Sequence, residues 1–162
     1  MQPLAILQLL VLLTLANGAP VIAKKFLGDR LARPLDGGIN FLDGRPLFGT
    51  SKTLRGILLA LAVTAAGAAL IGPGWRVGLA VGGLAMAGDL LSSFVKRRLN
   101  LKSSSRATGL DQLPEALLPA LGCRGALGLG GIDILLAVAI FFAGEVVFSR
   151  LLYRLRIRDE PY

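Results

Sequence analysis

Residues 2–20 read QPLAILQLLVLLTLANGAP, and this apolar run decides the fold class. A helix that crosses a bilayer needs roughly 20 consecutive, mostly apolar residues. A secretory signal peptide is the other interpretation of such an N-terminal run, but a signal peptide carries basic residues before its apolar core and this run has none. We therefore interpret the run as the first membrane span.

The rest of the chain continues the apolar pattern. Of its 162 residues, 54% are hydrophobic and only 17% are charged, more apolar and less charged than an ordinary soluble domain. Clear apolar segments cover Ile57–Ile71, Val77–Val95 and Ile132–Phe148, and a weaker one, Leu113–Leu129, contains two prolines and two charged residues. These segments predict an all-α, polytopic helical membrane protein that forms a single domain over residues 1–162.

Basic residues outside the apolar segments predict the topology. Lys and Arg accumulate in residues 24–55, 96–106 and 150–158. Because Lys and Arg near span ends are enriched on the cytoplasmic side, we expect both polar loops and the tail to be cytoplasmic. The tail reaches that side only if the weak segment spans the membrane or re-enters it deeply. The pattern predicts about five transmembrane helices in the plasma (inner) membrane; the alternative is a four-span protein with its basic tail outside.

Charge and composition also limit the chemistry. The formal net charge of +8 lies in the polar stretches, which suits an anionic membrane surface and an anionic substrate and does not indicate nucleic-acid binding. Cys123 is the single cysteine and there is no histidine, which excludes an internal disulfide, a zinc site of the usual kind and a Ser-His-Asp triad. Any metal must be held by oxygen ligands.

A glycine-rich stretch, DGRPLFGTSKTLRG at residues 43–56, lies in the first basic loop. Glycine lets backbone N–H groups approach phosphate oxygens closely, and Arg45, Lys52 and Arg55 add positive charge before the second span. The stretch is not a Walker A loop, because two residues separate Gly49 from Lys52 and no buried strand precedes it. We predict that the stretch binds a polyphosphate; a solvated basic linker is the alternative.

A second stretch, GDLLSSFVKRRL at residues 88–99, ends the third span. At helical spacing its polar residues share one face: Asp89, Ser92, Ser93 and Lys96. An acid at that depth is costly to insert and is a candidate functional residue. The third span therefore becomes polar on one face where it meets the cytoplasm.

Two acids border the second polar loop. Asp111 precedes the weak segment and is expected to approach Asp89. Two carboxylates with hydroxyls and waters form an oxygen site suited to Mg²⁺ bound together with phosphate oxygens. The alternative is that Asp89 pairs with Lys96 or Arg97 near the interface.

These motifs carry a family resemblance. DGRPLFGTSKTLRG, GDLLSSFVKRRL and LDQ at residues 110–112, in this order, resemble the CDP-archaeol synthase family, the CTP-dependent cytidylyltransferases that act on ether-lipid phosphates. The related bacterial phosphatidate cytidylyltransferases also have a KR pair after a GD and an acid further downstream, an order that Asp89, Lys96–Arg97 and Asp111 match. The C-terminal LYRLRIRDEPY is similar to the closing segment of the family.

The resemblance implies an enzyme that transfers CMP from CTP to a lipid phosphate, with Mg²⁺ as cofactor and release of pyrophosphate. Asp89 and Asp111 would hold the metal, and Lys96 and Arg97 would meet phosphate groups. The residues assigned to the nucleotide site are Asp43, Arg45, Lys52, Thr53 and Arg55, of which the first two have no more specific role. No protein nucleophile is required, because a phosphate monoester is largely ionised at neutral pH.

The chain departs from the family after LDQ. Archaeal members tend to have an acid and an aromatic there, whereas this chain reads LPEALLP at residues 113–119. Whether Glu115 replaces the missing acid, and whether the lipid has ether or ester linkages, stays open. Glu145 in the last span either joins the site or pairs with Arg124 or Arg150.

Two rival functions remain in view. A small transporter or channel subunit would place polar residues along several spans near the midplane, whereas the second and third spans carry no charge until their cytoplasmic ends. A non-catalytic membrane adaptor would need the basic loops but not the paired acids and glycines. A homo-oligomer is compatible with each function.

Overall fold

The computed structural model describes residues 1–28, 30–102, 105 and 107–154, and within them the regular secondary structure is helical. The helices are α1 (Pro3–Leu27), α2 (Leu54–Ile71), α3 (Trp75–Arg98), α4 (Gln112–Gly122), α5 (Arg124–Leu127) and α6 (Gly131–Arg154). Within the described residues, α1, α2 and α3 are long and apolar enough to cross a membrane. The prediction of an all-α membrane protein is confirmed.

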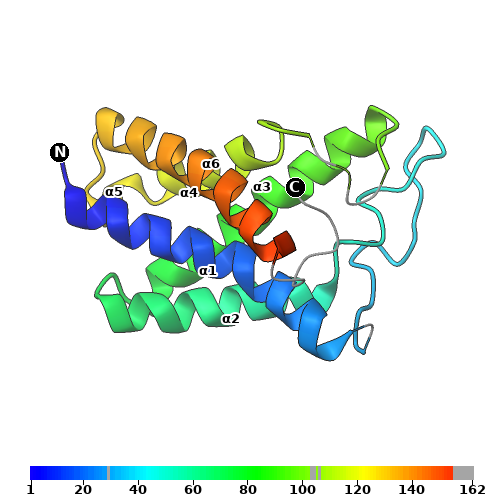
Figure 1. Ribbon diagram of the computed structural model, residues 1–162, viewed down its shortest axis with the longest axis horizontal. Helices are drawn as coiled ribbons and strands as arrows, with labels where there is room; N and C mark the ends of the chain where they lie inside the picture. Colours follow the sequence, from blue (N-terminus) through cyan, green and yellow to red (C-terminus); the bar gives the residue numbers. More distant parts are fainter. Residues whose placement is uncertain (29, 103–104, 106, 155–162) are drawn as a thin grey trace.

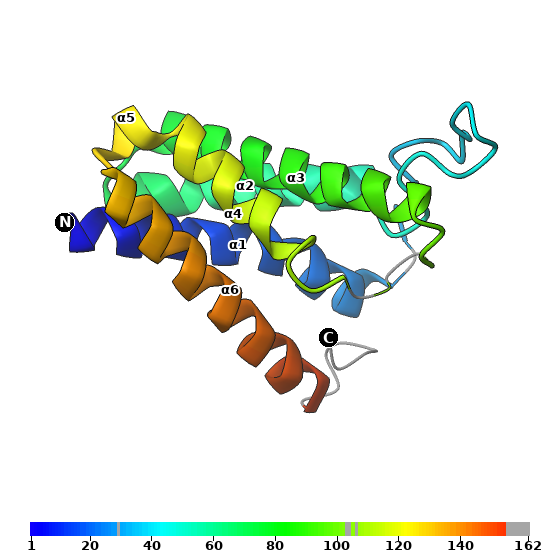
Figure 2. The same cartoon turned by 90° about the horizontal axis from the view of Figure 1, so that it is seen from above.

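The helices run lengthwise between two ends of the molecule (Figure 1). The N-terminus, the turn between α2 and α3, and α5 lie at one end, which we call the turn end. The other end, the loop end, carries the first loop (residues 30–53) and the second loop (the described residues between α3 and α4). Seen from above, α6 diverges from α1 and α4 as it leaves the turn end (Figure 2). The two polar loops therefore meet at one end, as their charge predicted.

Local sequence explains where α2 begins and ends. Thr53 is the N-cap residue, and its side-chain oxygen accepts a hydrogen bond from the backbone N–H of Gly56 at 3.2 Å. At the other end, Gly72 and Gly74 have φ angles of 115° and 90°, which residues with a side chain rarely adopt. The short turn to α3 is therefore built on glycine.

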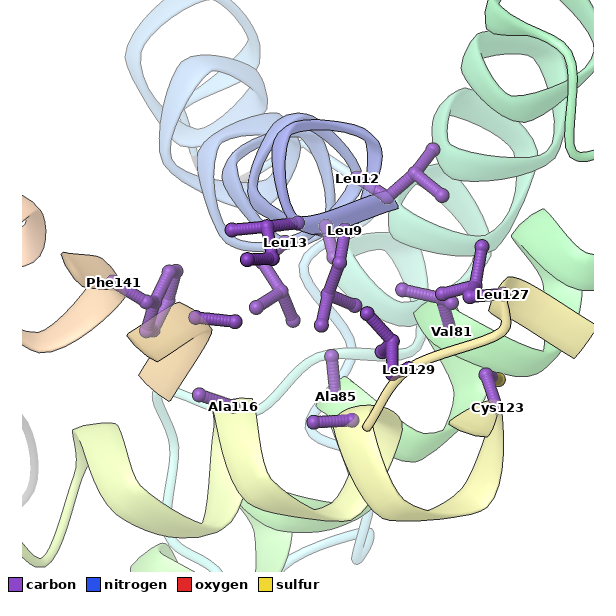
Figure 3. Close-up of a cluster of buried hydrophobic side chains, with 14 of the residues drawn as sticks. Leu9, Leu12, Leu13, Val81, Ala85, Ala116, Cys123, Leu127, Leu129 and Phe141 are labelled. Atoms are coloured by element: carbon purple, nitrogen blue, oxygen red, sulfur yellow. The ribbon is translucent and has the colours of Figure 1, made fainter. Parts of the chain in front are cut away.

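The core lies where α1 faces α3, α4 and α6 (Figure 3). Leu9 and Leu13 of α1 are fully buried, whereas Leu4 and Leu7 on its other face are 68% and 58% exposed. The remaining labelled residues of the cluster are Leu12, Val81, Ala85, Ala116, Cys123, Leu127, Leu129 and Phe141. In a bilayer the exposed leucines face lipid, so the helices are held together by close packing. α1 packs mainly on α2 and also contacts α3 and α6, while α3 packs extensively on both α2 and α4.

The weak apolar segment is not one continuous helix. α4 has 11 residues, and at 1.5 Å per residue it is about half the length that a hydrocarbon core of about 30 Å requires. The helix stops at Cys123, and the single turn of α5 follows. Together α4 and α5 carry the chain from the second loop to the turn end (Figure 1). The segment 113–129 thus returns the chain along the bundle, as expected, but in two pieces.

Candidate active site

A buried aspartate organises the first loop. Asp36 is only 7% exposed. One of its carboxylate oxygens accepts hydrogen bonds from the backbone N–H groups of Phe48 (2.9 Å) and Gly49 (3.1 Å), and the other accepts from the N–H of Gly38 (3.0 Å). Asp36 was not among the residues predicted from the sequence. The signal was its Asp-Gly-Gly context, because an aspartate side chain readily accepts from the backbone two residues on and glycine allows the turn.

The surroundings of Asp36 set its charge. Burial raises the pKa of the Asp36 carboxyl, but the N–H donors of Phe48, Gly38 and Gly49 outweigh burial and leave the pKa below the ordinary value of 3.8. A carboxyl whose folded pKa is lowered stabilises the fold fully above its unfolded pKa, and the contribution is lost as pH falls through the folded pKa. The first loop is therefore held by a charged carboxylate at neutral pH.

The Asp36→Asn variant is expected to open the first loop at neutral pH. Hydrogen bonds to a charged group contribute about 1.5–3 kcal/mol, so exchange of the Phe48 and Gly49 amide hydrogens should accelerate by roughly 10- to 100-fold. The ratio of variant to wild-type exchange rates removes the intrinsic pH dependence of exchange. This ratio should fall toward one as pH drops below 3.8. Asp133→Asn, at the turn end, is the control; a ratio near one at pH 7 for Asp36→Asn would contradict the prediction.

Near its end, the first loop reaches α3 through the ion pair between Lys52 and Asp89. Nζ of Lys52 lies 2.5 Å from both carboxylate oxygens of Asp89. The two side chains are about one-fifth exposed. The backbone of Lys52 is itself fixed, because its carbonyl accepts from the N–H of Leu35 at 2.8 Å and its N–H donates to Gly49 at 3.3 Å. The two motifs therefore meet through the side chains of two residues that are 37 positions apart.

A second carboxyl lies beside Asp89. Glu115 of α4 is 5% exposed, and its carboxyl is within hydrogen-bonding reach of Asp89, with Lys52 and Glu145 of α6 also near enough to act on its charge. The close approach depends on Gly88, since a Cβ there would lie 2.5 Å from the carbonyl carbon of Pro114. The sequence left the role of Glu115 open, and the structure places it against Asp89.

The KR pair lies about two turns further along α3. Nζ of Lys96 pairs with Asp111 at 2.7 Å and donates to the carbonyl of Ser105 at 3.1 Å. Arg97 donates to the carbonyl of Lys102 at 2.7 Å. Lys96 and Arg97 are buried, with exposed fractions of 8% and 6%. The second loop is thus folded over the end of α3, and two basic side chains lie beneath it.

The two acids predicted to hold a metal have different partners. Asp89 contacts Lys52, whereas Asp111 contacts Lys96 and accepts a hydrogen bond from the N–H of Ala107 at 3.1 Å. The alternative in which Asp89 pairs with Lys96 is therefore not what the structure has. The serine face of α3 contacts the residues before α4, since the Ser92 hydroxyl donates to the carbonyl of Leu110 at 2.6 Å.

The other first-loop candidates do not gather around Lys52. Arg55 donates to the carbonyls of Arg30 and, at 3.1 Å, Gly28, so it covers the end of α1. The Thr53 hydroxyl caps α2, as described above. Asp43 and Arg45 contact Arg98 at the tip of the loop. Of the five residues assigned to the nucleotide, the structure brings Lys52 alone against the acids of α3 and α4.

The carboxylates of Asp89 and Glu115 fit a magnesium ion that binds together with the phosphate groups of a substrate. Among the described residues, no group of three or more His, Cys, Asp and Glu side chains is arranged to hold a metal by itself. Mg²⁺ does not need such a group, because it commonly binds one or two carboxylates and fills its octahedral shell with waters and substrate phosphate oxygens. Asp89 and Glu115 offer carboxylate oxygens side by side, and the cation now paired with Asp89 is the ammonium of Lys52.

Comparison with known proteins identifies the family. The family model described as CarS-like CDP-archaeol synthase matches residues 74–162, from the start of α3 to the C-terminus. The chain belongs to the CDP-archaeol synthase family. A CDP-archaeol synthase of Sulfurisphaera tokodaii is 36% identical over 153 residues, covering 91% of this chain and 89% of the relative. One of Hyperthermus butylicus is 35% identical over 158 residues with the same coverage.

A solved structure agrees with the assignment. It is described as an intramembrane enzyme for archaeal membrane lipid biosynthesis, is 31% identical and superimposes with a TM-score of 0.69 over 86% of this chain and 91% of the other. The resemblance inferred from the three motifs is therefore confirmed. Two of those motifs, GDLLSSFVKRRL and LDQ, lie inside the region that the CDP-archaeol synthase model matches.

Proposed function

We propose that this family member transfers CMP from CTP to a lipid phosphate of the archaeal ether type, giving a CDP-lipid and pyrophosphate. The observation that carries the proposal is the contact between Lys52 and Asp89, because it joins the glycine-rich loop to the acidic end of α3. A nucleotide triphosphate is a polyanion, so its site needs fixed positive charge and backbone donors. Lys52 supplies positive charge where the first loop meets α3.

The reaction requires alignment and neutralisation of charge. An oxygen of the lipid phosphate attacks the α-phosphorus of CTP, and the bond from that phosphorus to the oxygen bridging to the β-phosphate breaks. Pyrophosphate leaves with the electron pair of that bond. Catalysis of phosphoryl-type transfer rests mainly on positioning and electrostatic stabilisation, so no protein nucleophile is needed.

Each basic residue has a proposed task. Lys52 holds phosphate oxygens of CTP at the junction of the first loop and α3. Lys96 and Arg97 neutralise a second phosphate group, either the departing pyrophosphate or the lipid phosphate. Their burial beneath the second loop lowers the local dielectric and strengthens these charge interactions.

The acids have complementary tasks. Asp89 and Glu115 would hold Mg²⁺ together with substrate phosphate oxygens, while Asp111 keeps Lys96 in place. Bound Mg²⁺ supplies charge neutralisation at the phosphates. Asp111 stays a second proposed metal ligand through the family resemblance. The packing of the Pro114–Glu115 backbone on Gly88, next to Asp89, supports Glu115 as a further ligand.

The site is proposed to face the cytoplasm. Both loops lie at the loop end, and their basic residues favour the cytoplasmic side of a membrane. The lipid tails would stay in the bilayer beside the helices, with the phosphate at the boundary where CTP arrives.

A direct assay tests the proposal. The purified protein in detergent is supplied with CTP, Mg²⁺ and one of two lipid phosphates, an isoprenoid ether or a fatty-acyl ester. We expect CTP-dependent pyrophosphate release and a CDP-lipid, faster with the ether lipid, and loss of both on chelation of the metal with EDTA. Folded protein that releases no pyrophosphate with either lipid would overturn the proposed function, and equal rates would overturn the ether preference.

A further inference from the structure

An arginine at the end of α3 holds the tip of the first loop. The guanidinium carbon of Arg98 lies 4.9 Å from the ring centre of Phe41 in the loop and 4.8 Å from that of Phe94 on α3. The two rings meet edge to face at 5.2 Å. Arginine is suited to this position, because its planar guanidinium stacks on aromatic rings while its N–H groups remain free to donate.

Polar contacts complete the attachment. Arg98 forms an ion pair with Asp43 at 3.1 Å and donates to the backbone carbonyl of Pro46 at 2.7 Å. In return, the guanidinium of Arg45 donates to the carbonyl of Arg98. We call Phe41, Asp43, Arg45, Phe94 and Arg98 the Arg98 latch. It includes the charged residues of the DGR motif, which the sequence analysis assigned to the nucleotide without a specific role.

A short segment of the first loop, held by hydrogen bonds, connects the Arg98 latch to the ion pair between Lys52 and Asp89. The loop tip forms a narrow hairpin in which Phe41 donates to Arg45 at 2.7 Å and Leu47 donates to Ile39 at 3.1 Å. The next residues, Phe48 and Gly49, are held by Asp36. Lys52 follows, with its N–H on the carbonyl of Gly49. Fixing the tip therefore restricts where the Lys52 ammonium lies.

We propose that Arg98 is a positioning residue that docks the first loop on α3 in the conformation that binds CTP. The inference rests on the proposed function for its nucleotide and on the contacts above for the docking. Arg98 acts through the loop, while Lys52 is the residue that meets the substrate.

Docking has a definite kinetic signature. If the docked loop is only a fraction of the population, the apparent dissociation constant for CTP rises in inverse proportion to that fraction. Saturating CTP restores the docked state, so kcat recovers. Loss of the latch should therefore raise the KM for CTP and leave kcat nearly unchanged, whereas loss of a catalytic charge lowers kcat.

The test uses Arg98→Lys, which keeps the charge but loses the planar stacking and the fork of donors. A second variant, Phe41→Leu, removes one ring from the loop side and leaves α3 untouched. The control is Arg76→Lys at the turn end of α3, where the guanidinium stacks on Trp75 at 5.4 Å. All are compared as full-length protein in detergent or nanodiscs.

Two readouts are measured. The first is amide hydrogen exchange of residues 39–49 without ligand, which should accelerate by roughly tenfold or more in both latch variants and not in the control, because the exchange rate follows the undocked fraction, which would rise from about one tenth or less to about nine tenths. The second is steady-state kinetics, in which KM for CTP should rise about tenfold at near-wild-type kcat, and saturating CTP should restore loop protection.

Each outcome decides the proposal. Unchanged exchange in both latch variants overturns the docking, and faster exchange with an unchanged KM overturns the role in CTP binding. A fall in kcat at unchanged KM would assign Arg98 to catalysis instead. If the wild-type protein neither binds nor turns over CTP, the proposed function fails and with it the assignment to CTP binding, while the exchange readout still decides whether Arg98 docks the loop.

Discussion

Replacing Asp89 with Asn is expected to lower kcat for CDP-lipid formation by about 10²- to 10³-fold, the usual effect of removing one electrostatic group from an active site. The substitution keeps the shape of the side chain and removes its charge. Both oxygens of Asp89 hold the Lys52 ammonium, and Glu115 lies beside them. Removing the charge of Asp89 therefore disturbs both the proposed metal site and the position of the Lys52 ammonium. Pyrophosphate release at saturating CTP and lipid measures it.

Lys52→Met should cause a loss of similar size, and the double variant should lose no more than the more damaging single one. Residues that act as one unit are not additive, so this pattern is the evidence that the ion pair works as a unit. The matched control is Lys102→Met, which removes the same charge from an exposed side chain at the same end of the molecule. A near-wild-type kcat in Asp89→Asn would show that Asp89 is not part of the active site. If the loss of kcat in the double variant equals the product of the two single losses, Asp89 and Lys52 act independently.

Gly88→Ala is expected to damage both stability and activity although it adds only a methyl group. The new Cβ would lie 2.5 Å from the carbonyl carbon of Pro114 and 2.7 Å from the amide nitrogen of Glu115. These atoms belong to backbone, so α3 and α4 must separate to relieve the clash. Overpacking of this kind costs about 1–3 kcal/mol. The separation also moves Glu115 away from Asp89, so kcat/KM should fall even at temperatures where the variant is folded.

The control for this prediction lies on the same helix. In Gly83→Ala the added Cβ meets only a side-chain methyl of Leu61 at 3.8 Å, an ordinary contact. Because alanine also has the higher helix propensity, this variant should be as stable and as active as wild type. Thermal unfolding in detergent and the CDP-lipid assay compare the two variants. Equal behaviour of Gly88→Ala and Gly83→Ala would show that α4 does not need its close approach to α3.

Helical spacing could not identify the partner of Asp89. It offered Lys96 or Arg97 as an alternative partner, because spacing identifies only neighbours on one helix. The structure pairs Asp89 with Lys52, 37 residues earlier, and leaves Lys96 to Asp111. A contact between a loop and a helix depends on how the loop folds, and that fold rests on Asp36, which no phosphate-loop pattern includes.

The first loop shows the same limit. Its glycines and basic residues suggested that DGRPLFGTSKTLRG binds a polyphosphate throughout, yet its residues divide into separate tasks. Arg45 and Asp43 dock the loop on Arg98, Thr53 caps α2, and Arg55 covers the end of α1. Residue type alone does not separate an arginine that binds phosphate from one that binds a backbone carbonyl, because both use the same donors.

By itself, the sequence determined that the chain is an all-α membrane protein of the CDP-archaeol synthase family, with its polar loops at a common end. Hydropathy, charge and motif order are properties of the sequence, and they can be determined without coordinates. Only the tertiary structure decided that Glu115 accompanies Asp89, that α4 ends after 11 residues, and that Arg98 holds the first loop. The physical reason is that each of these depends on two backbones approaching one another, and in this chain that approach is set by glycine contacts and a folded loop.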